Sequence, residues 1–320
     1  CHPFENPTAF TNFLELFAIV LIPASLVFMY GEMARARKHA WLLYFVMLFL
    51  LIAGLSVSIY SENLPNPVLG VSPSLEGKET RLGITNSVLW SVATTATANG
   101  SVNCMLSSLS PLAGGICMLN IMIGELIFGG VGVGLASMIF FVLLAVFLSG
   151  LMVGRTPEYL GKKIEWRDIQ WVIVAVLTPE ALILIGSSLA SGLQVALSSL
   201  SNHGPHGLSE ILYAFTSASG NNGSAFAGLN VNTTFYNVVL GCVMLTARTA
   251  IILPSLALGG LLAKKKITPS SLGTFSTDTF LFALLLLFSI LIIVAITYFP
   301  ALVLGPIVEH FLMLGGKSFS

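Results

Sequence analysis

Long apolar segments alternate with short polar ones along most of the chain. A membrane-spanning helix needs about 20 mainly apolar residues, and several segments reach that length. They are 11–31, 41–60, 117–153, 169–197, 235–263 and 279–300. Two further segments, 84–116 and 207–234, are only moderately apolar and are rich in Gly, Asn, Ser and Thr. The pattern predicts an all-α polytopic membrane protein.

Composition and charge narrow the class of protein. Hydrophobic residues make up 55% of the chain and charged residues only 9%, against about 25% charged residues in average soluble domains. The formal net charge of zero gives no bias toward nucleic acid or acidic substrates. The four cysteines show no CxxC spacing, which favours buried apolar side chains over a metal or redox site.

The basic residues set the expected orientation. Ten of the fourteen follow alternate apolar segments: Arg35, Arg37, Lys38, Arg155, Lys162, Lys163, Arg167, Lys264, Lys265 and Lys266. The positive-inside rule places these loops in the cytoplasm, so 84–116 and 207–234 must begin and end outside. Each is expected to be a re-entrant hairpin, a dipping helix followed by an irregular return strand. Such backbone is tolerated at membrane depth only inside protein or along an aqueous cavity, which indicates a pore.

The two predicted hairpins are copies of one another. A shift of 123 residues, from Asn99 to Asn222, superposes Asn99-Gly100-Ser101 on Asn222-Gly223-Ser224 without a gap. Further pairs follow the same shift: Trp90 with Tyr213, and Glu125 with Arg248. The repeated unit is helix, hairpin, helix, and its two copies share one orientation in the membrane.

Two copies of this unit leave an unmatched helix at each end of the chain. The expected division is 1–34 as the last helix of a preceding, missing unit, 35–160 as the third unit, 161–266 as the fourth unit, and 267–320 as a closing helix with the C-terminus. Two filter loops alone cannot surround an ion, so either two chains assemble or two more units lie upstream. The unmatched first helix favours a fragment that lacks upstream units.

The return strands have the composition of an ion filter. A strand of small residues with glycine at its centre can point several backbone carbonyls at one axis, as in potassium-channel filters, and Gly100 and Gly223 supply the φ freedom for this. Each dipping helix points its C-terminal, negative end inward, which favours a cation. We therefore expect a potassium-channel-like architecture with re-entrant pore helices and filter loops, K⁺ as the transported ion, and no bound cofactor.

Five segments carry a family resemblance: His2–Thr8, Leu75–Glu79, Gly154–Lys163, Gly204–Gly207 and Asn221–Gly228. They resemble the potassium-transporting ATPase A subunit family (KdpA), a relative of the Trk and Ktr potassium transporters built from four membrane–pore–membrane units. The resemblance runs through the whole chain but covers only the C-terminal half or so of a full subunit.

The resemblance assigns two filter strands. It implies that the fourth strand is formed by Asn221, Asn222 and Gly223, and the third by Ala98, Asn99 and Gly100. Many members carry Ser-Cys-Gly in the third strand. Ala98 and Asn99 depart from that version, while the glycine is kept.

The segment 117–153 is too long for one straight helix. At about 1.5 Å per residue it would run roughly 55 Å, against a hydrocarbon core of about 30 Å. We expect a break at its glycine cluster, which includes Gly129, Gly130 and Gly132. The resemblance implies that this broken helix helps to gate the filter.

Ionisable residues at membrane depth are candidate functional sites. Glu125 either offers a carboxylate to a cation below the filter or pairs with Arg248 for packing. The resemblance places the residue matching Arg248 below the filter, where its charge obstructs free conduction. Glu180 is interpreted as a neutral carboxyl that faces other helices. His206 flanks a Gly-Pro turn and is expected to shape that turn rather than to sense pH.

The sequence contains neither G-x-x-x-x-G-K-[ST] nor an Asp-Lys-Thr-Gly phosphorylation loop, so the chain itself is not expected to hydrolyse ATP. The resemblance implies a P-type ATPase complex for potassium uptake in the bacterial cytoplasmic (inner) membrane. Its partners there are the ATPase subunit KdpB and the subunits KdpC and KdpF. The competing interpretation is a stand-alone Trk/Ktr-type cation channel or symporter. An intramembrane hydrolase is disfavoured because no membrane-depth Ser–His or paired Asp constellation is present.

Overall fold

The computed structural model describes residues 8–68, 70, 74–130, 132–268 and 276–317. The family-like segment His2–Thr8 therefore lies outside the described residues except for Thr8. The elements in chain order are α1 (Ala9–Met33), α2 (Arg37–Glu62), α3 (Gly83–Ala96), η1 (Leu106–Ser108), α4 (Pro111–Met122), α5 (Val133–Val153), β1 (Glu158–Tyr159), β2 (Lys162–Lys163), α6 (Trp166–Gly192), α7 (Gln194–Leu197), α8 (Gly204–Gly220), α9 (Thr234–Lys264), α10 (Phe280–Leu302), η2 (Val303–Ile307) and α11 (Val308–Leu314).

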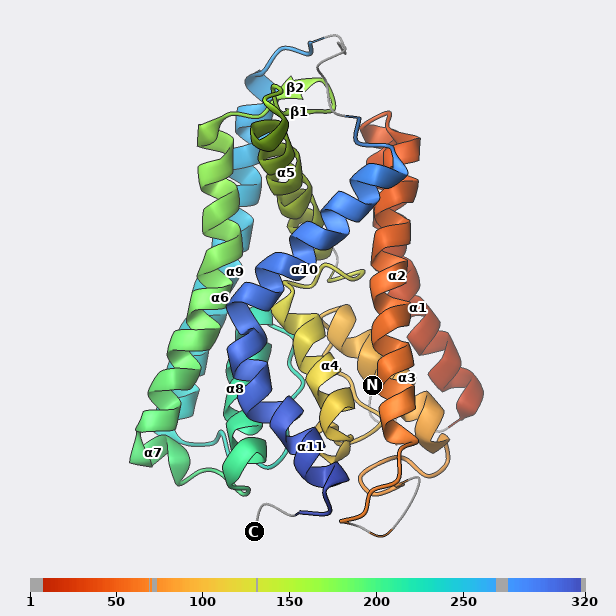
Figure 1. Ribbon diagram of the computed structural model, residues 1–320, viewed down its shortest axis with the longest axis vertical. Helices are drawn as coiled ribbons and strands as arrows, with labels where there is room; N and C mark the ends of the chain where they lie inside the picture. The colour runs from red at the N-terminus through yellow and green to blue at the C-terminus, as the bar shows by residue number, and fades with distance from the viewer. Residues whose placement is uncertain (1–7, 69, 71–73, 131, 269–275, 318–320) are drawn as a thin grey trace.

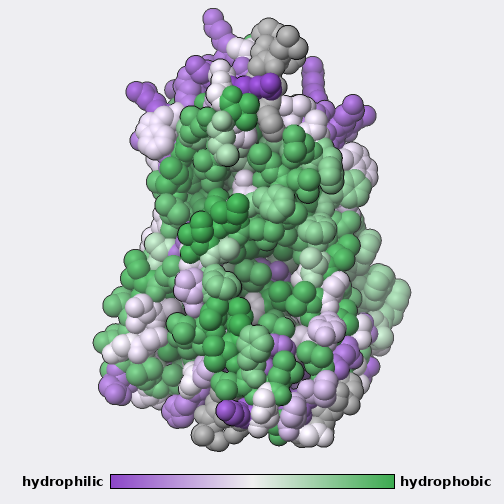
Figure 2. All heavy atoms as spheres, in the orientation of Figure 1, coloured by the Kyte–Doolittle hydropathy of each residue, from purple (hydrophilic) through white to green (hydrophobic). Residues whose placement is uncertain are grey.

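The long helices have the length and surface of membrane spans. Those apolar enough to cross a bilayer are α1, α2, α5, α6, α9 and the α10–α11 segment Phe280–Leu314. Large apolar side chains on them face outward, such as Phe45, Leu253 and Ile296, which are 56%, 60% and 77% exposed. Figure 2 shows an apolar band between two polar rims. The chain is a multi-pass membrane protein, and the regular elements of its described part are helices and the antiparallel pair β1–β2.

The predicted break in 117–153 is present, but it begins earlier than expected. α4 ends at Met122 and α5 starts at Val133. The backbone turns left-handed at Gly124, with φ +78°, before the chain reaches the glycine cluster. Gly132 caps the start of α5 with φ +86°. Glycine adopts such angles at little cost, so the break uses a glycine on each side of a short irregular link.

α3 and α8 are short helices in the same half of the molecule (Figure 1). α3 packs against α2 and α4, and α8 packs against α6 and α9. After each helix, the chain comes back beside the loop that preceded it. The bridge between Lys78 and Cys104 records this return for α3, and the bridge between Leu200 and Leu229 records it for α8.

The opposite end of the molecule holds β1–β2, the α1–α2 turn and the segment after α9 (Figure 1). Lys265 forms ion pairs with Asp168 and Glu165 at the start of α6. Lys162 Nζ donates to the Leu262 carbonyl at 2.7 Å. These contacts fasten the ends of α6 and α9 to the strand pair, so the predicted basic loops lie together at one rim.

Candidate functional site

The two return segments meet through their glycines. A Cβ built on Gly100 would lie 2.8 Å from the Asn222 carbonyl oxygen and 3.1 Å from Gly223 Cα. The two backbones are therefore in contact, and no side chain larger than hydrogen fits at Gly100. Gly223 has φ +95°, a conformation that favours glycine. The segments predicted as the third and fourth filter strands therefore lie against one another.

The two strands also begin with the same turn. Ala98 and Asn221 are equivalent under the repeat and both have left-handed backbones, with φ +53° and +51°. The side-chain oxygen of Asn99 accepts a hydrogen bond from the amide two residues later, at 2.8 Å. That of Asn222 accepts the equivalent bond at 3.0 Å. The 123-residue repeat is therefore present in local geometry as well as in sequence.

A buried aromatic residue supports each strand from its short helix. Trp90 Nε1 donates to Ser101 Oγ at 3.0 Å, and Tyr213 OH lies 2.7 Å from Ser224 Oγ in a hydrogen bond. Both aromatic side chains are fully buried. The sequence comparison paired Trp90 with Tyr213 but gave them no role. The usable signal was an aromatic residue with a polar tip, 11 residues before a strand serine in both copies.

A side-chain hydrogen bond also crosses between the two copies. Asn222 Nδ2 donates to the Thr94 backbone carbonyl of α3 at 3.2 Å. The Thr94 hydroxyl in turn donates to the Asn99 carbonyl. The last turns of α3 therefore bind both strands, and the repeat is asymmetric at this point.

Most strand carbonyls remain available to a ligand. Within the described part of the chain, Asn99 alone among the predicted filter residues uses its backbone carbonyl as a hydrogen-bond acceptor. The carbonyls of Ala98, Gly100, Asn221, Asn222 and Gly223 accept no hydrogen bond there. Backbone carbonyls need a hydrogen-bonding or ligand partner, so these carbonyls are free to bind water or a cation.

The strands open into a cavity on the side where their loops lie. This cavity has a volume of about 450 Å³ and is lined by Gly100, Gly223, Ser224 and Asn103 among others. A neighbouring cavity of about 620 Å³ contains His203 and His206 in its wall. An ion approaching from this end would reach the strand glycines directly.

Glu125 lies beside the ends of both short helices. Its side chain is buried, and neither carboxylate oxygen has a hydrogen-bond partner in the described chain. A Cβ on Gly220, at the end of α8, would lie 3.4 Å from Glu125 Oε1. A Cβ on Gly130 would lie 3.8 Å from Glu125 Oε2 and 3.8 Å from the Thr97 carbonyl oxygen. The α4–α5 link thus brings Glu125 next to the strand that begins after α3.

The glycines of the cluster where a break was expected allow the α4–α5 link to fold tightly. A Cβ on Gly129 would lie 1.9 Å from the Glu125 carbonyl oxygen. Arg248 lies on α9 and forms no ion pair with Glu125 within 4 Å in the described structure. The structure therefore does not contain the direct Glu125–Arg248 pair that was the packing alternative.

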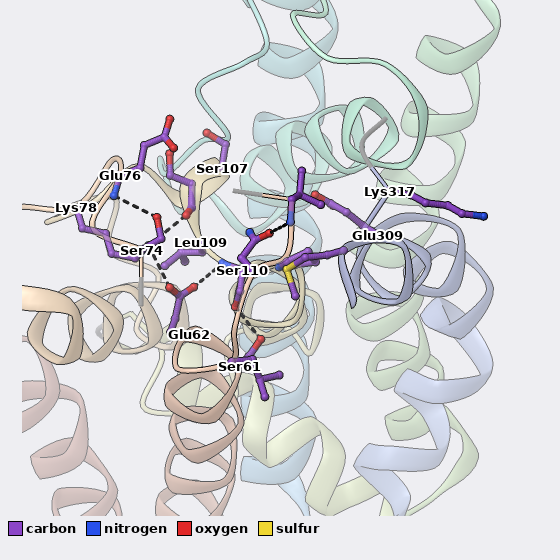
Figure 3. A pocket seen from close by; sticks show the side chains of 16 residues that line it. Ser61, Glu62, Ser74, Glu76, Lys78, Ser107, Leu109, Ser110, Glu309 and Lys317 are labelled. Atoms are coloured by element: carbon purple, nitrogen blue, oxygen red, sulfur yellow. Dashed lines mark hydrogen bonds and ion pairs between the residues drawn. The ribbon is translucent and has the colours of Figure 1, made fainter. Parts of the chain in front are cut away.

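A buried ion pair fixes the loop that leads into α3 (Figure 3). Lys78 Nζ lies 3.0 Å from Glu62 Oε2, and both side chains are at most 3% exposed. Lys78 also donates to the Ser108 carbonyl at 3.2 Å, and Glu62 accepts from the Ser110 amide. The pair joins the end of α2 to both sides of the α3 hairpin. The motifs and spacing in the sequence predict no role for either residue of this pair.

His206, at the start of α8, joins two carboxylates. Its Nδ1 lies 2.7 Å from Glu309 Oε1 on α11, and its Nε2 lies 3.9 Å from Glu210 Oε1. Burial lowers the pKa of the His206 imidazole, but the hydrogen bond to Glu309 and the charges of Glu309 and Glu210 raise it by more. The net pKa lies above the ordinary 6.5. The geometry adds a charge contact to the turn-shaping role expected from sequence.

We predict a pH-dependent contribution of His206 to stability. The pKa of His206 is raised in the folded state, so its protonated form stabilises the folded protein. This stabilisation is fully present below about pH 6.5 and is lost as the pH rises through the folded-state pKa. His206→Gln should cost about 1–3 kcal/mol at low pH and much less at pH 9. Thermal unfolding of the complete subunit from pH 6 to 9 measures this, with exposed His203→Gln as control. An equal cost of His206→Gln at every pH would contradict the charge contact.

Comparison with known proteins places the whole chain in one family. The family model described as KdpA, potassium-transporting ATPase A subunit, matches residues 1–311. A "potassium-transporting ATPase potassium-binding subunit" of Leptospira interrogans is 52% identical over 319 residues, 99% of this chain and 57% of that protein. Proteins of the same description from Pseudomonas entomophila and Rhodospirillum centenum are each 50% identical, over 97% and 99% of this chain and 56% of their own lengths.

The chain thus spans somewhat more than half the length of the curated relatives it matches. The match includes both strand segments, the α4–α5 link and the closing helices, and it agrees with the resemblance seen in the sequence motifs. The chain belongs to the KdpA family of potassium-transporting ATPase A subunits.

Proposed function

We propose that this chain forms the third and fourth membrane–pore–membrane units of a potassium-binding subunit. The observation that carries the proposal is the contact between the backbones at Gly100 and Gly223. The backbone carbonyls of Gly100 and Gly223 accept no hydrogen bond from the described chain. In this proposal α3 and α8 are re-entrant pore helices. The units are 35–160 and 161–266, preceded by a helix of the second unit in 1–34 and followed by the closing segment 267–320.

The orientation follows from charge. The basic loops lie together at the rim that holds β1–β2, and the positive-inside rule assigns that rim to the cytoplasm of a bacterial cell. The cavities beside the strands, at the end opposite β1–β2, then face outward. K⁺ enters them, exchanges its water shell for backbone carbonyls, and passes toward the α4–α5 link. The negative C-terminal ends of α3 and α8 favour a cation along this route.

The complete filter needs more chain than this. The relatives are longer, and we assign the first two filter strands to the part of the subunit that they have in addition. The chain has no nucleotide-binding motif of its own, so we propose that the ATPase subunit KdpB supplies the energy and that KdpC and KdpF complete the complex. The names of the relatives, potassium-binding subunits of a potassium-transporting ATPase, support this assignment.

Potassium-dependent ATP hydrolysis tests the proposed function. The complete subunit, assembled with its partners in the cytoplasmic membrane, should hydrolyse ATP faster as K⁺ is added, and Na⁺ should have little effect. Hydrolysis that ignores K⁺, combined with cation conduction by the subunit alone, would instead support a stand-alone Trk/Ktr-type channel or symporter.

Glu125→Gln tests the ion path below the filter. Removing the charge should lower the maximal rate of K⁺-stimulated ATP hydrolysis roughly tenfold, the effect of about 1.4 kcal/mol of lost cation stabilisation. The K⁺ concentration for half-maximal rate should stay the same, because the strands themselves are unchanged. Glu32→Gln, at an exposed acid paired with Arg37, is the matched control. Unchanged affinity and rate in Glu125→Gln would remove Glu125 from the ion path.

A further inference from the structure

A small cavity beside the α4–α5 link contains a second carboxylate. Its volume is about 40 Å³, and its lining includes Gly124, Glu125, Ser137, Pro179, Glu180 and Ser219. Glu180 lies in the middle of α6 and is 7% exposed. Sequence analysis interpreted it as a neutral carboxyl facing other helices. The structure places Glu180 against other helices, as expected, and in the same cavity as Glu125.

The proline next to Glu180 connects this cavity to the end of α8. Ser219 Oγ, in the last turn of α8, donates to the Pro179 carbonyl at 3.2 Å. On its other side, Glu180 Oε2 accepts a hydrogen bond from Thr297 Oγ1 on α10 at 3.3 Å. Glu180 is therefore held between the pore helix of the fourth unit and the closing helix.

The cavity brings two carboxyl groups together without a basic residue in its described lining. No Lys, Arg or His is among its described lining residues. Both Glu125 oxygens lack a hydrogen-bond partner in the described chain, and Gly220 brings the negative C-terminal end of α8 to the same wall. Buried carboxylates are unstable as anions without a close counter-charge. Arg248 lies outside the described lining, so a bound cation or bound protons must neutralise the two carboxyl groups.

The cavity has room and ligands for one cation. A cavity needs only about 10–15 Å³ of this volume to hold a water molecule, so 40 Å³ accepts one ion with few waters. Glu125, Ser137, Glu180 and Ser219 are among its lining residues, so carboxyl and hydroxyl oxygens are the polar side-chain groups that the lining offers. Oxygen ligands of this kind suit an alkali cation that has left a carbonyl filter.

We propose that Glu180 and Glu125 together form a second monovalent-cation site, which receives an ion after it has left the filter strands. Glu180 is a ligand in this site, and Thr297 positions it. The inference rests on the proposed function, because it takes K⁺ as the ion delivered. It goes further in assigning a binding site to an acid of α6 outside the filter and the link.

Thallium(I), a heavy substitute for K⁺, tests this site in crystals of the complete complex. The anomalous map of the unmodified protein should show Tl⁺ at the filter strands and a further peak in the Glu125–Glu180 cavity. Glu180→Gln should remove the cavity peak, with an affinity loss of about 10-fold or more, and leave the filter peaks. Thr297→Val, which removes the hydroxyl that positions Glu180, should weaken the cavity peak, and Glu32→Gln, at an exposed acid paired with Arg37, should leave it unchanged.

Filter peaks without a cavity peak in the unmodified protein would overturn the inference, because protons would then neutralise the pair. A cavity peak that survives in Glu180→Gln would also overturn it. A cavity peak without filter peaks would support the site but contradict the proposed filter, so the two failures are distinguishable. Kinetics give a second readout: Glu180→Gln should lower the maximal K⁺-stimulated rate while leaving half-maximal K⁺ unchanged.

Discussion

Gly100→Ala should sharply weaken the response of the complete complex to K⁺. The new methyl group would lie 2.8 Å from the Asn222 carbonyl oxygen and 3.0 Å from the Gly223 carbonyl carbon, atoms of a backbone that cannot rotate away. Overpacking of this kind costs about 1–3 kcal/mol. If the strands separate to relieve it, half-maximal stimulation should need roughly 5- to 150-fold more K⁺, and discrimination against Na⁺ should fall. Titration of ATP hydrolysis with each cation measures both.

The effect should be steric and local. Gly100 is not among the positive-φ glycines, so alanine causes no backbone strain there. Gly241 on α9 offers a matched control, because a Cβ there meets no atom within 4 Å. Gly241→Ala should leave the K⁺ response unchanged. A complex with Gly100→Ala that assembles and keeps its normal K⁺ response would contradict the close approach of the two strands.

Asn222→Ala should be more damaging than Asn99→Ala, although the two positions are equivalent in the repeat. Asn222 makes three side-chain hydrogen bonds, to Thr94 of the other unit and to the amide and hydroxyl of Ser224. Asn99 bonds only within its own unit. At about 1 kcal/mol per hydrogen bond, Asn222→Ala should lower the free energy of unfolding by about 3 kcal/mol, and Asn99→Ala should lower it by about 1–2 kcal/mol.

Thermal unfolding and cation selectivity of the two variants measure this difference side by side. Asn222→Ala should also raise Na⁺ stimulation, because it frees the fourth strand from α3. Each asparagine serves as the control for the other, since both changes remove the same amide. Equal losses in the two variants would show that the contact between units contributes nothing to the site.

The spans and the repeat were predictable because they depend on residue type and spacing alone. Runs of apolar residues set the positions of α1, α2, α6, α9 and α10, and the 123-residue shift identified both strands. The break in 117–153 followed from length. The position at which the break starts, Gly124, could not be predicted, because a single glycine is a weaker signal in the sequence than the glycine cluster that follows it.

The polar contacts that shape the site depend on three-dimensional neighbours. Lys78 and Glu62 are separated by an irregular loop, and nothing in their spacing indicates a buried pair. The bond from Asn222 to Thr94 joins different repeat units. Glu180 looked like an isolated acid in an apolar helix, and only the packing of α5, α6 and α8 brings it to Glu125. Such pairings need the fold before they can be seen.

The arrangement offers a physical reason for having two unlike copies. The repeat supplies matching strands, each with a left-handed first residue and an aromatic support. The residues after the strands differ: Glu125 follows the third strand and Arg248 the fourth. In the proposed function, the strands recognise the ion together, while the residues after them differ in charge between the two copies.

The position of bound rubidium in crystals of the complete subunit tests the central claim most directly. Rb⁺ substitutes for K⁺ and scatters anomalously, so its peaks locate the ion independently of any activity. The proposed filter predicts Rb⁺ between the strands of Gly100 and Gly223, within coordination distance of their backbone carbonyls. Rb⁺ bound elsewhere in the subunit, with none beside these two glycines, would contradict the assignment of this site.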